Sequence, residues 1–147
     1  MQDAAAMPKH LRLKGLIVCE AMLRLCRLMT DHFDCDLESF VCYMAVVSAN
    51  VGRMRREPDG FADDEPPSAE ERRPVSRRAV AASVGLPRET VRRKVMELVE
   101  KGHVIEVRGG LQAVAPALEH AENLQIVLGA IRTFQRTAAE LEEVDRR

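Results

Sequence analysis

The stretch Ser76-Arg-Arg-Ala-Val-Ala-Ala-Ser-Val-Gly-Leu-Pro-Arg-Glu-Thr-Val-Arg-Arg93 decides the fold of this 147-residue chain. Ser76 is an N-cap residue for a helix over 77–83, and Gly85 supplies the left-handed conformation that ends such a helix. Pro87 fixes a backbone angle that suits a helix entrance. Apolar residues then return at helical spacing over 88–101. The stretch therefore predicts two short helices joined by a tight turn.

A β-hairpin is predicted directly after the second helix. Residues 104–108 and 111–114 are rich in β-branched and apolar side chains. Gly109 and Gly110 lie between them and supply the positive φ that a two-residue turn requires. Helix, turn, helix and hairpin together form one predicted module over 74–115.

Two longer helices are predicted before this module, and together they form an N-terminal helical pair over 1–56. Residues 11–29 are apolar around most of a helix circumference, as in a helix buried in a bundle or between subunits. A second helix follows Asp36 and runs to about Arg55. Its apolar face has steps of three and four residues and comprises Phe40, Met44, Val47, Val51 and Met54.

An acidic loop over 57–73 is predicted to join this pair to the module. Residues 57–71 hold three prolines and seven carboxylates and no basic residue, which is typical of a flexible loop. Residues 72–101 instead carry nine basic and three acidic side chains. The formal net charge of -1 therefore conceals a basic module beside an acidic loop, which favours a polyanionic partner.

The segment 116–147 is predicted to be a dimerisation helix. Its apolar residues recur at steps of 3, 4, 3, 4 and 3 and are Leu124, Val127, Ile131, Phe134, Ala138 and Leu141. A heptad seam of this kind pairs with another helix. A second copy of the chain is the expected partner, and packing within one chain is the alternative. Gly129 within the seam indicates a close helix approach or a bend.

Residues 74–115 resemble the winged helix-turn-helix domain of bacterial transcription regulators. Gly85-Leu-Pro-Arg-Glu-Thr-Val-Arg-Arg93 is similar to the turn and recognition helix of the cyclic-AMP-receptor class. Ser76-Arg-Arg-Ala-Val-Ala-Ala-Ser-Val84 and Glu97-Leu-Val-Glu-Lys-Gly102 resemble regulators of the GntR and MarR types. The resemblance implies a mainly α fold with a small β-hairpin, and a bacterial regulator of transcription that binds double-stranded DNA.

Two positions depart from the family pattern. Lys94 stands where many members have an apolar residue, and Pro87 replaces the usual Ser or Thr cap. The residues before the module read as two helices and a loop, so a cyclic-nucleotide-binding β-roll does not fit there. The resemblance therefore implies DNA-binding geometry but names no effector, and a small-molecule effector stays an open possibility.

The helix that begins at Arg88 is expected to enter the major groove, where arginine bonds guanine O6 and N7 together. The resemblance assigns base reading to Arg88, Glu89 and Arg93. Contacts to the DNA backbone are expected from Arg72, Arg73, Arg77, Arg78, Thr90, Arg92, Lys94 and Arg108. A homodimer would present two such helices to a pseudo-palindromic site. The alternative is a winged-helix protein–protein interaction module that does not bind DNA.

No enzyme, cofactor or metal is expected from the remaining residues. Spacings of seven or more residues separate Cys19, Cys26, Cys35 and Cys42, unlike the short Cys-x2-Cys pairs of zinc sites, and buried thiols act as small hydrophobes. A redox or metal sensor is the alternative interpretation.

The absence of a long uncharged apolar run and of a secretory signal predicts a cytosolic protein without a membrane partner.

Overall fold

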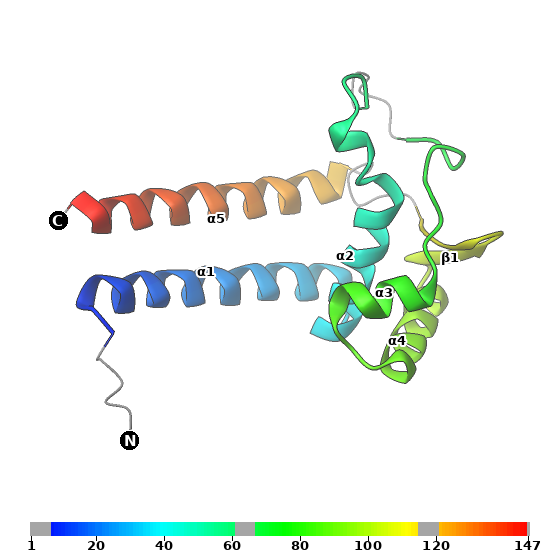
Figure 1. The fold of residues 1–147 in the computed structure, drawn as a ribbon, viewed down its shortest axis with the longest axis horizontal. Helices are drawn as coiled ribbons and strands as arrows, with labels where there is room; N and C mark the ends of the chain where they lie inside the picture. The colour runs from blue at the N-terminus through cyan, green and yellow to red at the C-terminus, as the bar shows by residue number, and fades with distance from the viewer. Residues whose placement is uncertain (1–6, 61–66, 115–120, 147) are drawn as a thin grey trace.

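The computed structural model describes residues 7–60, 67–114 and 121–146. It is mainly helical, with one small two-stranded antiparallel hairpin, as the sequence predicts. A pair of long helices extends to one side, and the shorter helices and the hairpin gather on the other (Figure 1). None of the described helices is long and apolar enough to cross a membrane.

Helices α1 (Lys9–Phe33) and α5 (Ala121–Arg146) lie side by side and antiparallel (Figure 1). Lys14 near the start of α1 forms an ion pair with Asp145 near the end of α5. The two helices are called the arm below. The predicted start of the last helix near Pro116 lies outside the described residues.

The two arm helices approach each other closely at Gly129. A Cβ atom at this position would lie 3.3 Å from Leu28 Cδ2 of α1. Ala130 and Thr133 of α5 are buried nearby, and the Thr133 hydroxyl donates to the Gly129 carbonyl at 2.9 Å. The structure thus assigns Gly129 to a close helix approach, one of the two roles expected for it.

Helix α2 (Leu37–Val51) begins at Asp36, whose carboxylate accepts a hydrogen bond from the Ser39 backbone N–H at 2.8 Å. Its buried side comprises Ser39, Cys42, Tyr43, Val46 and Asn50. This side packs against α3, α4 and β2. Together with α3, α4 and the hairpin, α2 forms a unit called the head below.

The prediction of which side of this second helix is buried was wrong. The buried positions lie about one residue earlier in the sequence than the predicted ones. Met44 is exposed, and Phe40, Val47 and Val51 are half-buried beside the buried side rather than on it. Met54 is buried, but in a separate 3-10 turn, Met54–Arg56, after α2 has ended. Since residues 40–47 are almost all apolar, their spacing alone did not decide which side faces inward.

The two predicted N-terminal helices differ in where they pack. Helix α1 packs along α5, whereas α2 packs mainly within the head. The two helices meet where Phe33 ends α1, and the Phe33 ring lies 5.9 Å from the Phe40 ring and 5.2 Å from that of Tyr43.

The core of the head lies between α2, α3 (Arg77–Val84), α4 (Arg88–Glu100) and the hairpin. Its members are buried apolar side chains drawn from every one of these elements: Cys42, Tyr43, Val46, Val80, Ala81, Val91, Val95, Leu98, Val104, Leu111 and Ala113. Burial raises the pKa of the Cys42 thiol, as expected for a cysteine packed as a small hydrophobe.

Strands β1 (Val104–Val107) and β2 (Gly110–Ala113) form the hairpin. Val107 pairs with Gly110, so the turn residues are Arg108 and Gly109, one position earlier than predicted. Val75 adds a β-bridge on the other side of β2, where it exchanges backbone hydrogen bonds of 3.1 and 2.8 Å with Leu111. A Cβ at position 110 would lie 2.4 Å from the Val75 carbonyl oxygen, so this close approach requires glycine.

Candidate nucleic-acid interface

The start of α4 is set by the turn before it. Ser76 caps α3 by accepting from the Ala79 backbone N–H at 3.1 Å, and Gly85 ends α3 at φ 69°. Pro87, at φ −56°, stands at the cap position of α4 and makes no side-chain cap hydrogen bond. The predicted cap, turn and helix entrance are confirmed.

Helix α4 is buried along one side and exposed along the other. Val91, Val95 and Leu98 are almost fully buried and contact the core of the head. The opposite side begins at the first turn and carries Arg88, Glu89, Arg92, Arg93 and Met96, all exposed. Positions 89, 92, 93 and 96 follow the spacing that places residues on one helix face. The predicted base-reading residues therefore lie together at the accessible end of α4.

Glu89 and Arg92 are joined on this face. Arg92 donates from Nε at 2.9 Å and from Nη2 at 2.6 Å to the two carboxylate oxygens of Glu89. These hydrogen bonds hold the pKa of Glu89 below its usual value. Arg88 and Arg93 make no hydrogen bond or ion pair with any residue the structure describes, so their guanidinium groups are available to a partner.

Met96 also lies on the exposed face and was not predicted to belong to it. Its side chain is 44% exposed, and its sulfur accepts a hydrogen bond from Arg92 Nη1 at 2.9 Å. The i to i+4 spacing from Arg92 was the signal in the sequence that could have indicated it. An apolar side chain here is of a size to contact the methyl group of thymine, a contact that apolar residues make in the major groove.

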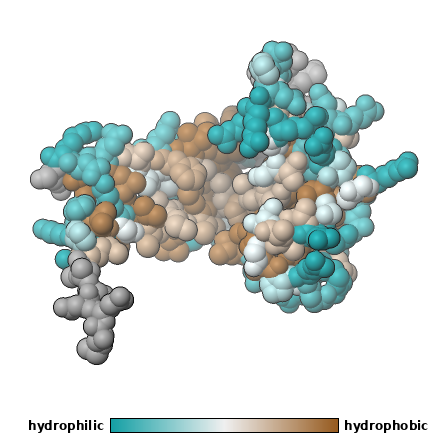
Figure 2. Space-filling model, viewed as in Figure 1, coloured by the Kyte–Doolittle hydropathy of each residue, from teal (hydrophilic) through white to brown (hydrophobic). Residues whose placement is uncertain are grey.

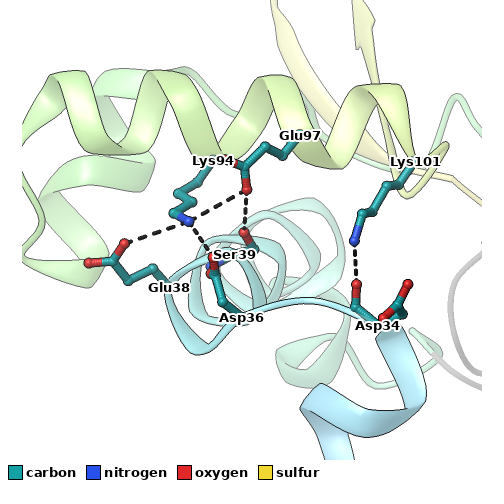
Figure 3. Close-up of polar contacts among 7 residues, drawn as sticks. All are labelled: Asp34, Asp36, Glu38, Ser39, Lys94, Glu97 and Lys101. Atoms are coloured by element: carbon teal, nitrogen blue, oxygen red, sulfur yellow. Dashed lines mark hydrogen bonds and ion pairs between the residues drawn. The ribbon is translucent and has the colours of Figure 1, made fainter.

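Lys94 is corrected. It was expected to contact the DNA backbone, but its side chain is directed away from the exposed face of α4 and is only 5% exposed (Figure 3). Its ammonium group hydrogen-bonds Asp36 and lies 3.5 Å from a Glu97 oxygen and 3.8 Å from a Glu38 oxygen. The hydrogen bond that Lys94 donates to Asp36 raises the pKa of Lys94. Carboxylates of α4 and of the start of α2 thus meet the charge of this buried lysine.

The other residues that were predicted to contact the DNA backbone fall into two groups. Arg72 donates to the Ala113 carbonyl at 2.8 Å, and Arg77 forms an ion pair with Glu106 of β1, so both are already used within the chain. Exposed side chains that form no hydrogen bond or ion pair within the described part of the chain are those of Arg73, Arg78 and Arg108. Thr90 is half-buried in the first turn of α4.

Asn50 holds the hairpin in place and was not singled out from the sequence. Its side-chain amide donates to the carbonyls of Arg73 at 2.8 Å and Leu111 at 3.1 Å. Its side-chain oxygen accepts from the Ala113 backbone N–H at 2.8 Å. This buried amide therefore fixes β2 and the chain before Val75 onto α2. The sequence signal was a polar residue four positions after the apolar Val46.

Four of the six residues of the predicted dimerisation seam on α5 are exposed among the residues that the structure describes. Leu124 is 52% exposed, Ile131 45% and Phe134 64%, and Ala138 is exposed as well. Val127 and Leu141 are half-buried. Within the described part of the chain, the seam is thus covered only in part, at Val127 and Leu141.

Among the described residues, no group of three or more His, Cys, Asp or Glu side chains is arranged to hold a metal ion. All four cysteines are free thiols. A scan against protein-family models and searches of curated proteins and solved structures returned no significant match. The functional assignment therefore depends on the geometry and charge described above.

Proposed function

We propose that the protein is a transcription regulator that binds double-stranded DNA through a winged helix-turn-helix and acts as a homodimer. The observation that carries the proposal is the exposed N-terminal half of α4. Arg88 and Arg93 form no hydrogen bond or ion pair there with any residue that the structure describes, while the opposite side of the helix is anchored in the core. An α-helix fits the major groove with its N-terminal residues against the base edges.

The order of elements in the head supports this assignment. A first helix, α2, is followed by the Val75 bridge, then by α3 and α4 across a glycine turn, and then by a hairpin joined to that bridge. A winged helix-turn-helix is built from these parts, with α4 as the recognition helix and the hairpin as the wing. In this arrangement the hairpin turn at Arg108 extends beyond the core and is free to contact a neighbouring phosphate or groove.

Charged side chains are divided between base reading and backbone contact in this proposal. Arg88 and Arg93 read guanine, and Glu89 accepts from cytosine N4. Arg92 keeps the Glu89 carboxylate ionised and oriented through its two hydrogen bonds. Backbone contacts come from Arg73, Arg78 and Arg108, with Thr90 at the helix start.

Binding to DNA is tested by the salt dependence of its affinity for a pool of duplex fragments. The affinity should fall steeply as salt rises, because each phosphate contact releases condensed counterions. The control is Arg132→Ala, which removes one exposed arginine from α5 without touching α4 and should leave the affinity unchanged. Arg93→Ala should weaken binding to a preferred site by about 1–3 kcal/mol.

A winged-helix module that binds another protein is the competing function. It predicts no salt-dependent association with any duplex and the same behaviour for Arg93→Ala as for Arg132→Ala. That outcome would overturn the DNA-binding proposal.

A further inference from the structure

One side of the arm carries exposed apolar side chains on both of its helices. On α5 this side is the seam, whose exposed members are Leu124, Ile131, Phe134 and Ala138. On α1 it is a row of exposed apolar side chains and one glycine at steps of four, three and four residues: Leu11, Gly15, Val18 and Met22. These eight residues are called the uncovered face below. Figure 2 shows apolar side chains gathered along the middle of the arm.

A groove shows that the two rows lie on the same side of the arm. This groove has a volume of about 310 Å³ and lies where the arm meets α2. Met29, which continues the α1 row by seven residues, lines it together with Ile131 and Phe134 of the seam. A depression on the opposite side of the arm is lined by three charged side chains, Arg136, Glu140 and Glu143, together with Leu13, Ile17, Ala139 and Val144.

No described residue packs closely against Gly15 in a way that would require a glycine. It lies inside α1, where glycine weakens a helix relative to alanine, and a Cβ added to it would meet no atom within 4 Å. Gly129 is different, because a neighbouring helix occupies the space beside it. A glycine in the middle of an apolar helix face allows another helix backbone to approach closely.

One whole side of the arm, which includes the uncovered face, has the size that a stable dimer requires. Helices of 25 and 26 residues are each roughly 38 Å long at about 1.5 Å per residue. Two such helices packed side by side present a face roughly 20 Å wide. The product, about 760 Å², is close to the roughly 800 Å² that each partner contributes to a standard protein–protein interface.

We propose that the uncovered face binds the same face of a second copy to form a four-helix bundle, and that Gly15 is where the partner's helix crosses α1. This inference deepens the homodimer of the proposed function by naming both helices and the point of closest approach. It concerns self-association only and does not depend on whether α4 contacts DNA. The groove beside Phe134 is then the end of the same interface.

Two adjacent alanines provide a matched test of this interface. The mass of the full chain and of its variants is measured by light scattering across a series of protein concentrations. Ala138 lies on the uncovered face and Ala139 does not, yet both are exposed, so glutamate at either position costs no packing within the chain. Wild type and Ala139→Glu should have the mass of two chains. Ala138→Glu should associate at least about tenfold more weakly.

Gly15→Leu gives an independent readout. Leucine favours a helix more than glycine does, so on a free surface the substitution would leave association unchanged or strengthen it. At a close helix crossing it should weaken association at least about tenfold while the circular dichroism keeps its helical signal. A wild-type chain that stays monomeric, equal behaviour of the two alanine variants, or undiminished association of Gly15→Leu would overturn the inference.

DNA binding, measured on the same samples, separates this inference from the proposed function. A dimer that binds no duplex contradicts the function and leaves the interface intact. A monomer that binds duplex with salt dependence contradicts the interface alone.

Discussion

Lys94 of α4 donates a hydrogen bond to Asp36, the residue that caps the start of α2. The pair joins the proposed recognition helix to the first helix of the head across 58 residues of sequence. It therefore fixes the orientation of α4 from its buried side while the exposed side stays free. A lysine that looks like a DNA contact in the sequence thus has a positioning role.

Replacing Lys94 with methionine should affect stability rather than DNA contact. The three carboxylates it leaves are each 41–53% exposed and keep much of their hydration, so the free energy of unfolding should fall by only about 1 kcal/mol. The slope of DNA affinity against salt should not change. Arg78→Met is the control and should lower that slope by about one unit. Equal slopes for the two variants would contradict the assignment.

Stability should depend on the charge of Asp36 at low pH. Its pKa is lowered from 3.8 to about 2, chiefly by the hydrogen bond from Lys94 and against the effect of burial. The charged form therefore stabilises the folded state above pH 3.8, and this contribution is lost as the pH falls from 3.8 toward 2.

Asp36→Asn isolates this effect, since asparagine still caps a helix but does not titrate in this range. Urea unfolding should show wild type more stable than the variant near pH 5, with the difference shrinking toward pH 2. A difference that is constant with pH would mean that the ion pair contributes nothing to folding.

Removing the Asn50 side chain should loosen the hairpin. Asn50→Ala removes the hydrogen bonds that Asn50 makes to the Arg73 carbonyl and the Ala113 N–H, while the Leu111 carbonyl keeps its bond from the Val75 N–H. Each unsatisfied group costs about 1–3 kcal/mol, so a loss of roughly 2 kcal/mol or more is expected in urea unfolding. Ser48→Ala, an exposed change on the same helix, serves as the control. If Asn50→Ala lowered the free energy of unfolding by less than Ser48→Ala, the role of Asn50 in holding the hairpin would be contradicted.

Arginines on α4 and outside it should behave differently toward DNA. Arg88→Ala should lower affinity for the preferred site and relax the preference at one base pair. Arg73→Ala should weaken binding to all duplexes alike and reduce the salt slope by about one unit. Arg72→Ala should instead lower stability, because its hydrogen bond to the Ala113 carbonyl is lost. If Arg88→Ala weakened the affinity for all duplex sequences equally, the base-reading role of Arg88 would be contradicted.

Local features were predictable from the sequence because they depend on adjacent residues. Ser76, Gly85 and Pro87 fix the ends of α3 and the start of α4 by backbone rules that require no distant partner. The heptad steps on α5 likewise indicated an apolar seam that its own chain leaves largely open.

Distant pairings were not predictable in the same way. The fully apolar run in α2 gave no preferred side, so its buried face and its place in the head emerge only from packing against α4. Lys94 looked solvent-exposed because its acidic partners lie near position 36, far away in sequence. The turn at Arg108 moved by one residue because Gly110 is needed where β2 passes Val75.

Selection of bound sequences from a random duplex library tests the central claim most directly. A homodimer that inserts α4 into successive major grooves should enrich a two-fold symmetric motif with half-sites roughly 34 Å, or about 10 base pairs, apart. The same selection with Arg93→Ala should lose its preference at one position in each half-site and keep the spacing. No enrichment by the wild-type chain, or an Arg93→Ala motif identical to that of wild type, would contradict the account.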